Sequence, residues 1–366
     1  MGEVELTSAH IGGQLDCTGG QFSNPNDIAL NADGLTVDAG MFCRKGFLAT
    51  GEVHLLGAHI RGQLDCTGGH FANSGGVALT ADELTIDGSL LCREGFSATG
   101  EVRLLGAHIG GVLDCTDGHF SNPNSSALTA DRLTVDGSLL CREGFSATGE
   151  VRLLGAHIGG VLDCMGGQFS NPDGSALNLW GATVAGPLHM APAVLQGILD
   201  LTAAKTSSYH DDPAFWPYTL RLDRFVYDAL EGASTTERLE WLRRNQRDYS
   251  PQIYEQLAAV YRRTGHDEDA RRILIAKQRR RFAQGNLAGK LGGFLLDCTV
   301  GYGYRTWLAL VWLAGLLALG TYLFGYAYRG DLTPASKTNV PPPFQSFSTP
   351  SISSSPSPVS TSVTAG

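Results

Sequence analysis

Cysteine and histidine are the residues of this chain that could bind a metal or carry redox chemistry, and both recur at a fixed spacing. Four histidines each stand seven positions before a cysteine, with an aspartate directly before that cysteine: His10/Cys17, His59/Cys66, His108/Cys115 and His157/Cys164. Three more cysteines share the 49-residue spacing: Cys43, Cys92 and Cys141. Imidazole, thiolate and carboxylate are common metal ligands, so the pattern raises the hypothesis of a metal or redox ladder.

The residues around each cysteine favour a structural role instead. In Ala58-x-Ile60-x-Gly62-x-Leu64-x-Cys66 the apolar residues alternate with others, as in a strand with one buried face. The thiol therefore points into the core, and later copies place Met190 and Leu201 in its position. No Cys-x-x-Cys pair occurs. We predict buried cysteines without disulfides, and no catalytic, cofactor-binding or metal-binding residue.

The same alternation turns the histidines and the aspartates before the cysteines outward. We interpret them as a solvated stripe along one face, the alternative being a weak cation site. The stripe comprises His10, His59, His108 and His157 beside Asp16, Asp65, Asp114 and Asp163.

The elements that carry these residues are 49-residue repeats, each of them double. The step from Cys17 to Cys43 is longer than the step from Cys43 to Cys66, and the two steps alternate along the chain. Short alternating strands separated by glycine turns predict a mainly β fold, a β-solenoid over residues 1–204 whose coils pair edge to edge. Its first coil starts inside a repeat without a polar cap, so end-to-end self-association is a further expectation.

The charge balance also differs between the repeat region and the rest of the chain. Residues 1–200 carry 22 acidic and 8 basic side chains, whereas residues 201–366 carry 14 acidic and 19 basic ones. Residues 205–234 are interpreted as a connecting segment. Residues 235–300 are predicted to form a helical hairpin followed by a basic juxtamembrane segment, with one helix starting at Ser250-Pro251 and ending at Gly265. That hairpin resembles half of a tetratricopeptide unit.

An apolar segment follows at residues 306–328. No residue between Trp307 and Tyr328 is charged, and 22 residues of helix span about 33 Å, enough for a bilayer core of ~30 Å. We predict one transmembrane helix with aromatic residues at both ends. The tail at residues 329–366 is rich in Ser, Pro and Thr and is predicted to be disordered.

Basic residues gather on the N-terminal side of that segment. The positive-inside rule therefore predicts a single-pass protein of the cell membrane with a cytoplasmic N-terminus and an extracytoplasmic C-terminus. No signal peptide opens the sequence. The basic side chains are expected to contact anionic lipid headgroups. They are Arg279, Arg280, Arg281, Lys290 and Arg305.

Three stretches resemble a group of actinobacterial single-pass membrane proteins: residues 149–160, 249–279 and 297–305. The repeat is also similar to pentapeptide-repeat and polymer-forming solenoids. Members of the actinobacterial group are often labelled membrane-associated oxidoreductases, so the resemblance implies an enzyme. The residues themselves contain no dinucleotide-binding Gly-x-Gly-x-x-Gly motif after a strand and no redox cysteine pair.

These observations predict a membrane-anchored structural or interaction scaffold that presents an acidic solenoid to the cytoplasm. Its expected partners are the lipid bilayer and a cytoplasmic protein, with no cofactor and no nucleic acid. A membrane-associated oxidoreductase is the alternative. A DNA-mimicking inhibitor comes third, because the solenoid has a net charge of −14.

Overall fold

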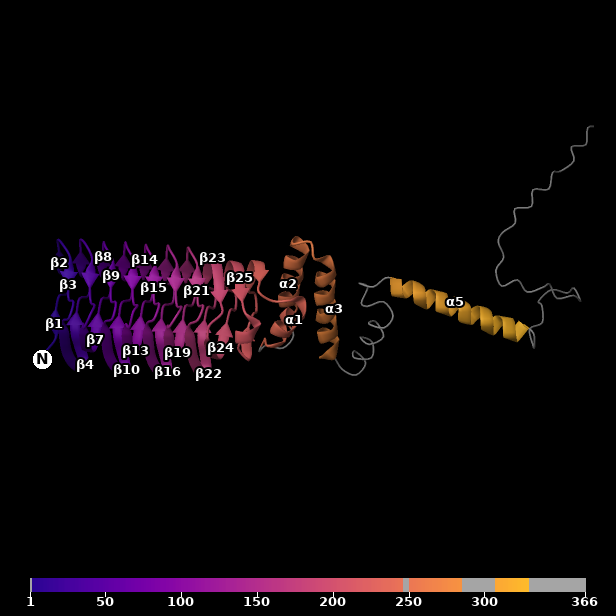
Figure 1. Cartoon of the computed structure of the whole chain (residues 1–366), viewed down its shortest axis with the longest axis horizontal. Coiled ribbons are helices and arrows are strands. Elements are labelled where there is room, and N and C mark those ends of the chain that lie inside the picture. Colours follow the sequence, from indigo (N-terminus) through magenta and orange to yellow (C-terminus); the bar gives the residue numbers. More distant parts are fainter. Residues whose placement is uncertain (1, 246–249, 285–306, 329–366) are drawn as a thin grey trace, which may run out of the picture. The chain divides into compact units, whose positions relative to one another are not determined.

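The computed structural model of the protein describes residues 2–245, 250–284 and 307–328 (Figure 1). The chain divides into two units, Met1–Gly285 and Asn286–Gly366. The first unit is a parallel β-solenoid of ten coils, followed by three α-helices that cover its C-terminal end. The predicted β-solenoid is therefore confirmed.

One strand from every coil forms the first sheet, and all of its pairings are parallel. Its strands, in spatial order, are β1 (Val4–Glu5), β4 (Gln21–Asn31), β7 (Leu48–His54), β10 (His70–Thr80), β13 (Ser97–Arg103), β16 (His119–Thr129), β19 (Ser146–Arg152), β22 (Gln168–Asn178), β24 (Val194–Asp200) and β26 (Thr219–Arg221).

The second sheet carries two short strands per coil over the first seven coils and one longer strand in each of the last three. The first row is β2 (His10–Ile11), β5 (Thr36–Val37), β8 (His59–Ile60), β11 (Thr85–Ile86), β14 (His108–Ile109), β17 (Thr134–Val135) and β20 (His157–Ile158). The second row is β3 (Leu15–Asp16), β6 (Met41–Phe42), β9 (Leu64–Asp65), β12 (Leu90–Leu91), β15 (Leu113–Asp114), β18 (Leu139–Leu140) and β21 (Leu162–Asp163). Both rows continue into β23 (Thr183–Met190), β25 (Lys205–Asp211) and β27 (Val226–Glu231).

The solenoid extends further than the sequence analysis predicts. The sequence pattern of residues 205–234 is interpreted as a connecting segment. In the structure these residues form β25, β26, β27 and a short 3-10 helix, η1 (Pro213–Phe215). The coils continue because Leu220, Leu222, Phe225 and Tyr227 fill the buried positions that the repeats give to Leu, Ala and Ile. We call residues 2–231 the rod.

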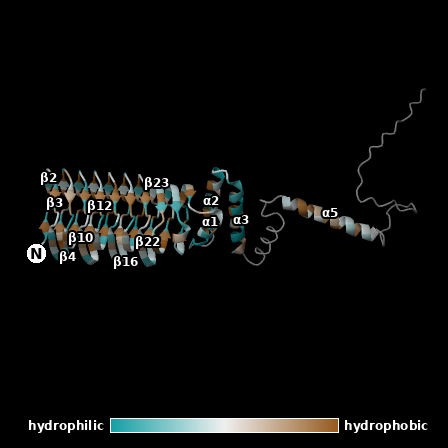
Figure 2. Cartoon of the chain, in the orientation of Figure 1, coloured by the Kyte–Doolittle hydropathy of each residue, from teal (hydrophilic) through white to brown (hydrophobic). Residues whose placement is uncertain are grey.

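Identical side chains stack in columns inside the rod. Seven phenylalanines from Phe22 to Phe169 have ring centroids 5.0–5.6 Å apart on successive coils. The apolar positions of the repeat are buried, with Ile60 and Leu64 at most 1% exposed. Figure 2 shows these hydrophobic strands separated by more polar turns. The alternation of the sequence thus places one apolar face of each strand in a continuous core.

Every second coil carries a bulge in its long strand, where the register shifts (β4, β10, β16 and β22). In the third such coil the Asn122 side chain donates to the carbonyl of Ser126 at 2.9 Å and closes the bulge. Gly149 of the next coil lies against it with φ +117°, and a Cβ there would come within 2.5 Å of the Asn122 carbonyl oxygen. Only glycine fits at that contact.

The helices of the first unit are α1 (Thr235–Arg243), α2 (Pro251–Arg263) and α3 (Asp267–Ala283). The predicted start at Pro251 and break at Gly265 are confirmed. Helices α2 and α3 pack as a hairpin, burying Leu257, Ala258 and Ile273.

The second unit contains α5 (Trp307–Tyr328), which covers the predicted transmembrane segment. Among the residues that the structure describes with their side chains, no helix is both long and apolar enough to cross a membrane. The predicted disordered tail and the predicted contact residues Lys290 and Arg305 lie outside the described residues.

Candidate functional surfaces

The cysteines form an interior column of the rod. Six of its seven thiols are at most 3% exposed, and none of the seven is in a disulfide. The neighbouring thiol of Cys141 and burial together raise the pKa of Cys115, and burial raises that of Cys164. Because the thiolate is the reactive form of cysteine, a raised pKa makes these thiols unreactive in the folded protein. The predicted burial of Cys66, Cys92, Cys115 and Cys141 is confirmed.

Within the described residues, three of the four outward histidines, all except His157, have aspartate partners that the sequence pattern does not predict. Nε2 of His10 lies 2.9 Å from Oδ2 of Asp38, and the copies further along the rod pair at 3.0 and 3.2 Å. These are His59/Asp87 and His108/Asp136. The partner lies on the adjacent coil, because His10 pairs in register with Thr36 and the aspartate follows two positions after that threonine. The hydrogen bond from His10 lowers the pKa of Asp38.

Asp65 and Asp163 are covered rather than solvated, which corrects the predicted stripe, whereas Asp114 is partly exposed and Asp16 of the first coil is exposed as predicted. Asp65 is 6% exposed and Asp163 is 8% exposed. The Asp65 carboxylate accepts from the backbone N–H of Thr67 at 3.0 Å and from Arg44 of the preceding coil at 3.4 Å. The backbone of its own coil and Arg44 of the preceding coil thus engage both of its carboxylate oxygens.

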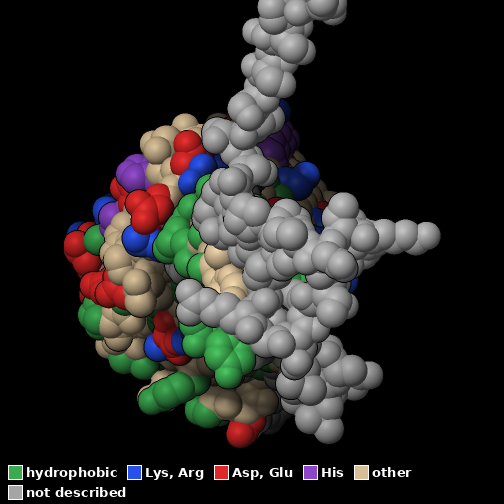
Figure 3. Space-filling view, turned by 90° about the vertical axis from the view of Figure 1, so that its right-hand side faces the viewer, with side chains coloured by type: hydrophobic (Ala, Val, Ile, Leu, Met, Phe, Trp, Pro, Cys, Tyr) green, Lys and Arg blue, Asp and Glu red, His purple; other side chains and the backbone are tan. Residues whose placement is uncertain are grey.

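Six Arg–Asp pairs repeat along the rod, each joining residues of adjacent coils at the same separation in sequence. Three join the aspartate before a cysteine: Arg44/Asp65, Arg93/Asp114 and Arg142/Asp163. Two join an aspartate at the opposite turn, Asp82/Arg103 and Asp131/Arg152, and one joins the end of β24 to the in-register residue of β26, Asp200/Arg221. Figure 3 shows acidic and basic side chains beside one another on the face in view. Six of the rod's aspartates thus have a basic partner on an adjacent coil.

A buried ion pair joins α1 to the end of the rod. Nη1 and Nη2 of Arg238 donate to the two carboxylate oxygens of Asp211 at 2.8 and 2.5 Å, and both side chains are at most 1% exposed. The guanidinium also donates to the carbonyl of Glu231 and lies 5.4 Å from the ring centroid of Trp241. The Trp216 indole donates to the same carboxylate at 2.7 Å. Arg238 therefore fixes the helices on the last coils.

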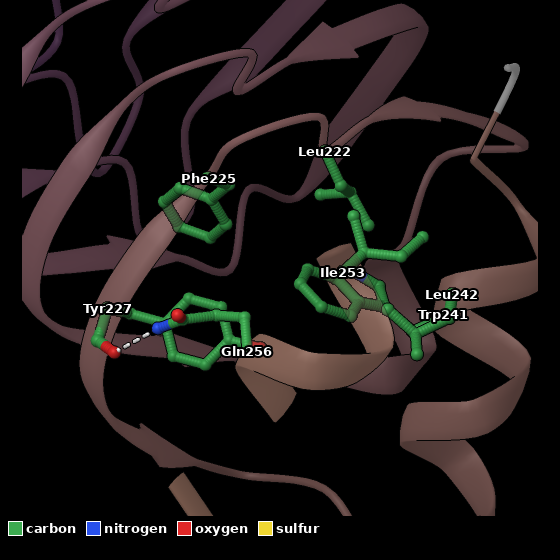
Figure 4. Close-up of a pocket in the computed structure, with 7 residues that line it drawn as sticks. All are labelled: Leu222, Phe225, Tyr227, Trp241, Leu242, Ile253 and Gln256. Atoms are coloured by element: carbon green, nitrogen blue, oxygen red, sulfur yellow. Dashed lines mark hydrogen bonds between the residues drawn. The ribbon is translucent and has the colours of Figure 1, made fainter. Parts of the chain in front are cut away.

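Side-chain amides complete the hydrogen bonding of the last coil. Oδ1 of Asn245 accepts from the N–H of Leu222 at 3.0 Å, and Oε1 of Gln252 accepts from the N–H of Arg224 at 2.8 Å. Gln256 donates to the carbonyl of Tyr227 at 2.8 Å beside a small apolar pocket (Figure 4). In preceding coils the equivalent N–H groups donate to backbone carbonyls of the next coil. The helices therefore take the place of an eleventh coil.

The predicted membrane-contact residues of the first unit end α3. Arg279, Arg280 and Arg281 occupy its last turns, with Arg279 and Arg281 exposed. Lys277, one turn earlier, pairs with Glu255 of α2. Cations at a helix C-terminus also interact favourably with the helix dipole, so the cluster has a local stabilising role besides any surface contact.

Among the described residues, no group of three or more His, Cys, Asp or Glu side chains is arranged to hold a metal ion. Comparisons with protein-family models, with curated proteins and with solved structures find no match. The protein is thus defined by its architecture, a parallel β-solenoid consistent with a pentapeptide-like repeat fold, with a helical cap.

Proposed function

We propose that the protein is a membrane-tethered scaffold whose rod presents repeated polar columns to a cytoplasmic protein partner. The observation that carries this proposal is the contrast between the inside and the outside of the rod. The inside holds buried thiols, whereas the outside repeats the same Arg–Asp and His–Asp pairs at a fixed spacing. A periodic surface on a rigid core suits the recognition of another protein better than catalysis does.

Charge reversal on the rod tests the scaffold. Cross-linking in cells, followed by identification of the cross-linked proteins, should give a partner that is lost when Arg103 and Arg152 are both changed to Glu. The matched control reverses Arg271 and Arg272 on α3, away from the rod columns, and should leave the partner attached. Equal cross-linking by both variants would contradict the proposal.

The tether is proposed from α5 and its flank. Its uncharged side chains include exposed leucines such as Leu310, Leu316 and Leu323, which would be covered by lipid. A reporter phosphatase fused after Gly366 should be active, and the same enzyme fused before Met1 inactive, because the basic flank favours the cytoplasm. The reverse pattern would overturn this orientation.

The basic end of α3 is proposed to contact anionic headgroups. Each basic residue near such a surface contributes about 1 kcal/mol, so residues 1–300 should bind anionic vesicles weakly and lose that binding when Arg279, Arg280 and Arg281 become Gln. Added salt should weaken the binding through screening. The Arg271→Gln/Arg272→Gln variant is the control. Equal binding to neutral vesicles would contradict the electrostatic account.

The resemblance to actinobacterial single-pass membrane proteins labelled oxidoreductases remains a proposal. Six of the seven described thiols are buried, and the seventh, Cys17, is partly buried, so the described residues offer no exposed redox pair. A flavin or nicotinamide absorption spectrum from the purified full-length protein would favour the enzyme. DNA mimicry is less favoured, because arginines pair with six of the rod's carboxylates and interrupt its acidic surface.

A further inference from the structure

Two histidines near the end of the rod occupy facing positions on neighbouring coils. His189 of β23 pairs in register with His210 of β25, and their ring centroids are 5.6 Å apart at an interplanar angle of 68°. Their side chains are 32% and 42% exposed. No other pair of the ten histidines makes a ring contact in the described part of the chain.

A carboxylate lies on the Nδ1 side of each ring. Nδ1 of His210 is 3.3 Å from Oε2 of Glu231, and Nδ1 of His189 is 4.0 Å from Oδ1 of Asp163. Within the described residues, no hydrogen bond engages Nε2 of either ring. The hydrogen bond between Nδ1 of His210 and Glu231 favours the neutral tautomer that has its lone pair on Nε2, as in metal-bound histidines, whereas Asp163 is within ion-pair distance of His189 only.

The histidines that pair with an aspartate of the adjacent coil have the opposite arrangement. His10, His59 and His108 direct Nε2 at an aspartate. They also recur only on every second coil, which separates them by roughly 10 Å at the usual strand spacing, too far for two rings to share one ion. The break in the repeat at His189 and His210 therefore brings together two free ligand atoms that the regular coils keep apart.

We propose that His189 and His210 form a surface chelate for a borderline divalent cation such as Zn²⁺, through the Nε2 atom of each ring. Imidazole suits Zn²⁺, Cu²⁺ and Ni²⁺. Two nitrogens bound to one tetrahedral Zn²⁺ lie roughly 3.3 Å apart, which centroids 5.6 Å apart permit once both Nε2 atoms turn toward each other. Water or a partner's side chain completes the coordination, and Glu231 orients the ring of His210.

The site lies beside the cap. His210 directly precedes Asp211, the carboxylate that binds Arg238. A metal that joins β23 to β25 would therefore bind the folded end of the rod and stabilise it by mass action. This gives a readout that does not depend on any activity.

Zinc titration of the full-length protein in detergent micelles, carrying no histidine tag, tests the proposal. Competition with a chromophoric chelator gives the affinity, and thermal unfolding gives the shift in Tm. We expect one Zn²⁺ per chain and a raised Tm, with at least a tenfold loss of affinity in His189→Gln and in His210→Gln. His59→Gln and His108→Gln are the matched controls and should change affinity less than twofold.

Glu231→Gln separates orientation from simple ligation. Because Glu231 fixes the ring of His210, its loss should weaken zinc binding by several-fold and leave the stoichiometry at one. Circular dichroism of each variant without metal checks that the rod is folded. Absence of zinc binding in the wild type, or unchanged affinity in the folded His189→Gln variant, would overturn the site.

Discussion

The interior coils and the last coil satisfy their backbone hydrogen bonds in different ways. An interior coil satisfies its backbone by pairing with a near copy of itself on each side, as Cys66 N–H does with the carbonyl of Leu91. The last coil has no copy beyond it and uses Asn245, Gln252 and Arg238 instead. Repetition specifies the first arrangement, whereas individual residues specify the second. A single substitution should therefore harm the cap more than an equivalent one harms a coil.

The largest difference is expected between two ion pairs. Arg238→Ala leaves the buried Asp211 carboxylate without its cation and should lower the free energy of unfolding by about 3–5 kcal/mol. Arg152→Ala breaks a half-exposed pair with Asp131 and should cost about 1 kcal/mol or less. Chemical denaturation measures both, and hydrogen exchange should show β25 and β27 opening first in Arg238→Ala. Equal costs would remove the distinction between cap and coil.

Glycine substitutions test the interior. Gly149→Ala forces a Cβ to within 2.5 Å of the Asn122 carbonyl oxygen at φ +117°, and should cost on the order of 3 kcal/mol. Gly155→Ala is the matched control, because its Cβ would enter open space and the same turn position holds Arg132 at φ +56°. It should cost about 1 kcal/mol. A tolerated Gly149→Ala would show that the bulge can move.

The thiol column gives a smaller effect. Cys115→Ala should cost about 1–2 kcal/mol through a small cavity, and Cys115→Ser as much or more because it buries a hydroxyl. Because burial and the neighbouring thiol raise the pKa of Cys115, its alkylation should be slow in the native protein at neutral pH and fast in denaturant. Rapid native labelling would mean that the coils open locally.

The smallest effect is expected at Gln256, where one amide replaces one backbone partner. Gln256→Ala removes the hydrogen bond to the Tyr227 carbonyl and should cost about 0.5–1.5 kcal/mol. Gln196→Ala, on an exposed strand surface of the rod, is the control and should be near neutral. Should Gln256→Ala prove as neutral as the control, packing alone would hold α2 on the last coil.

The rod's interior could be predicted from sequence because period and alternation act locally. The burial of Cys66, the helix start at Pro251 and the helix break at Gly265 follow from such signals. The pairs His10/Asp38 and Arg44/Asp65 could not be predicted without the register between coils, which depends on the lengths of two turns.

The helical hairpin could be predicted, but the contacts that hold the cap on the rod could not, because they do not repeat. An arginine in a charged helix is normally expected to be exposed, and only the structure shows that Arg238 is buried against Asp211. The extra coils did leave a signal, since Leu220-x-Leu222 and Phe225-x-Tyr227 alternate like the repeats. The contact between His189 and His210 could not be predicted from the repeat, because their separation in sequence is shorter than either of the alternating steps between the cysteines.

The length of the rod depends on the number of 49-residue double repeats. Each 49-residue unit ends on the same backbone geometry with which it begins, so Cys66 and Cys115 occupy equivalent environments. Inserting or deleting one unit between them would change the span of the rod by two strand spacings, roughly 10 Å, and leave the last coils and their helices untouched. The distance between the N-terminal coil and the helical cap is therefore a quantity that copy number sets in discrete steps.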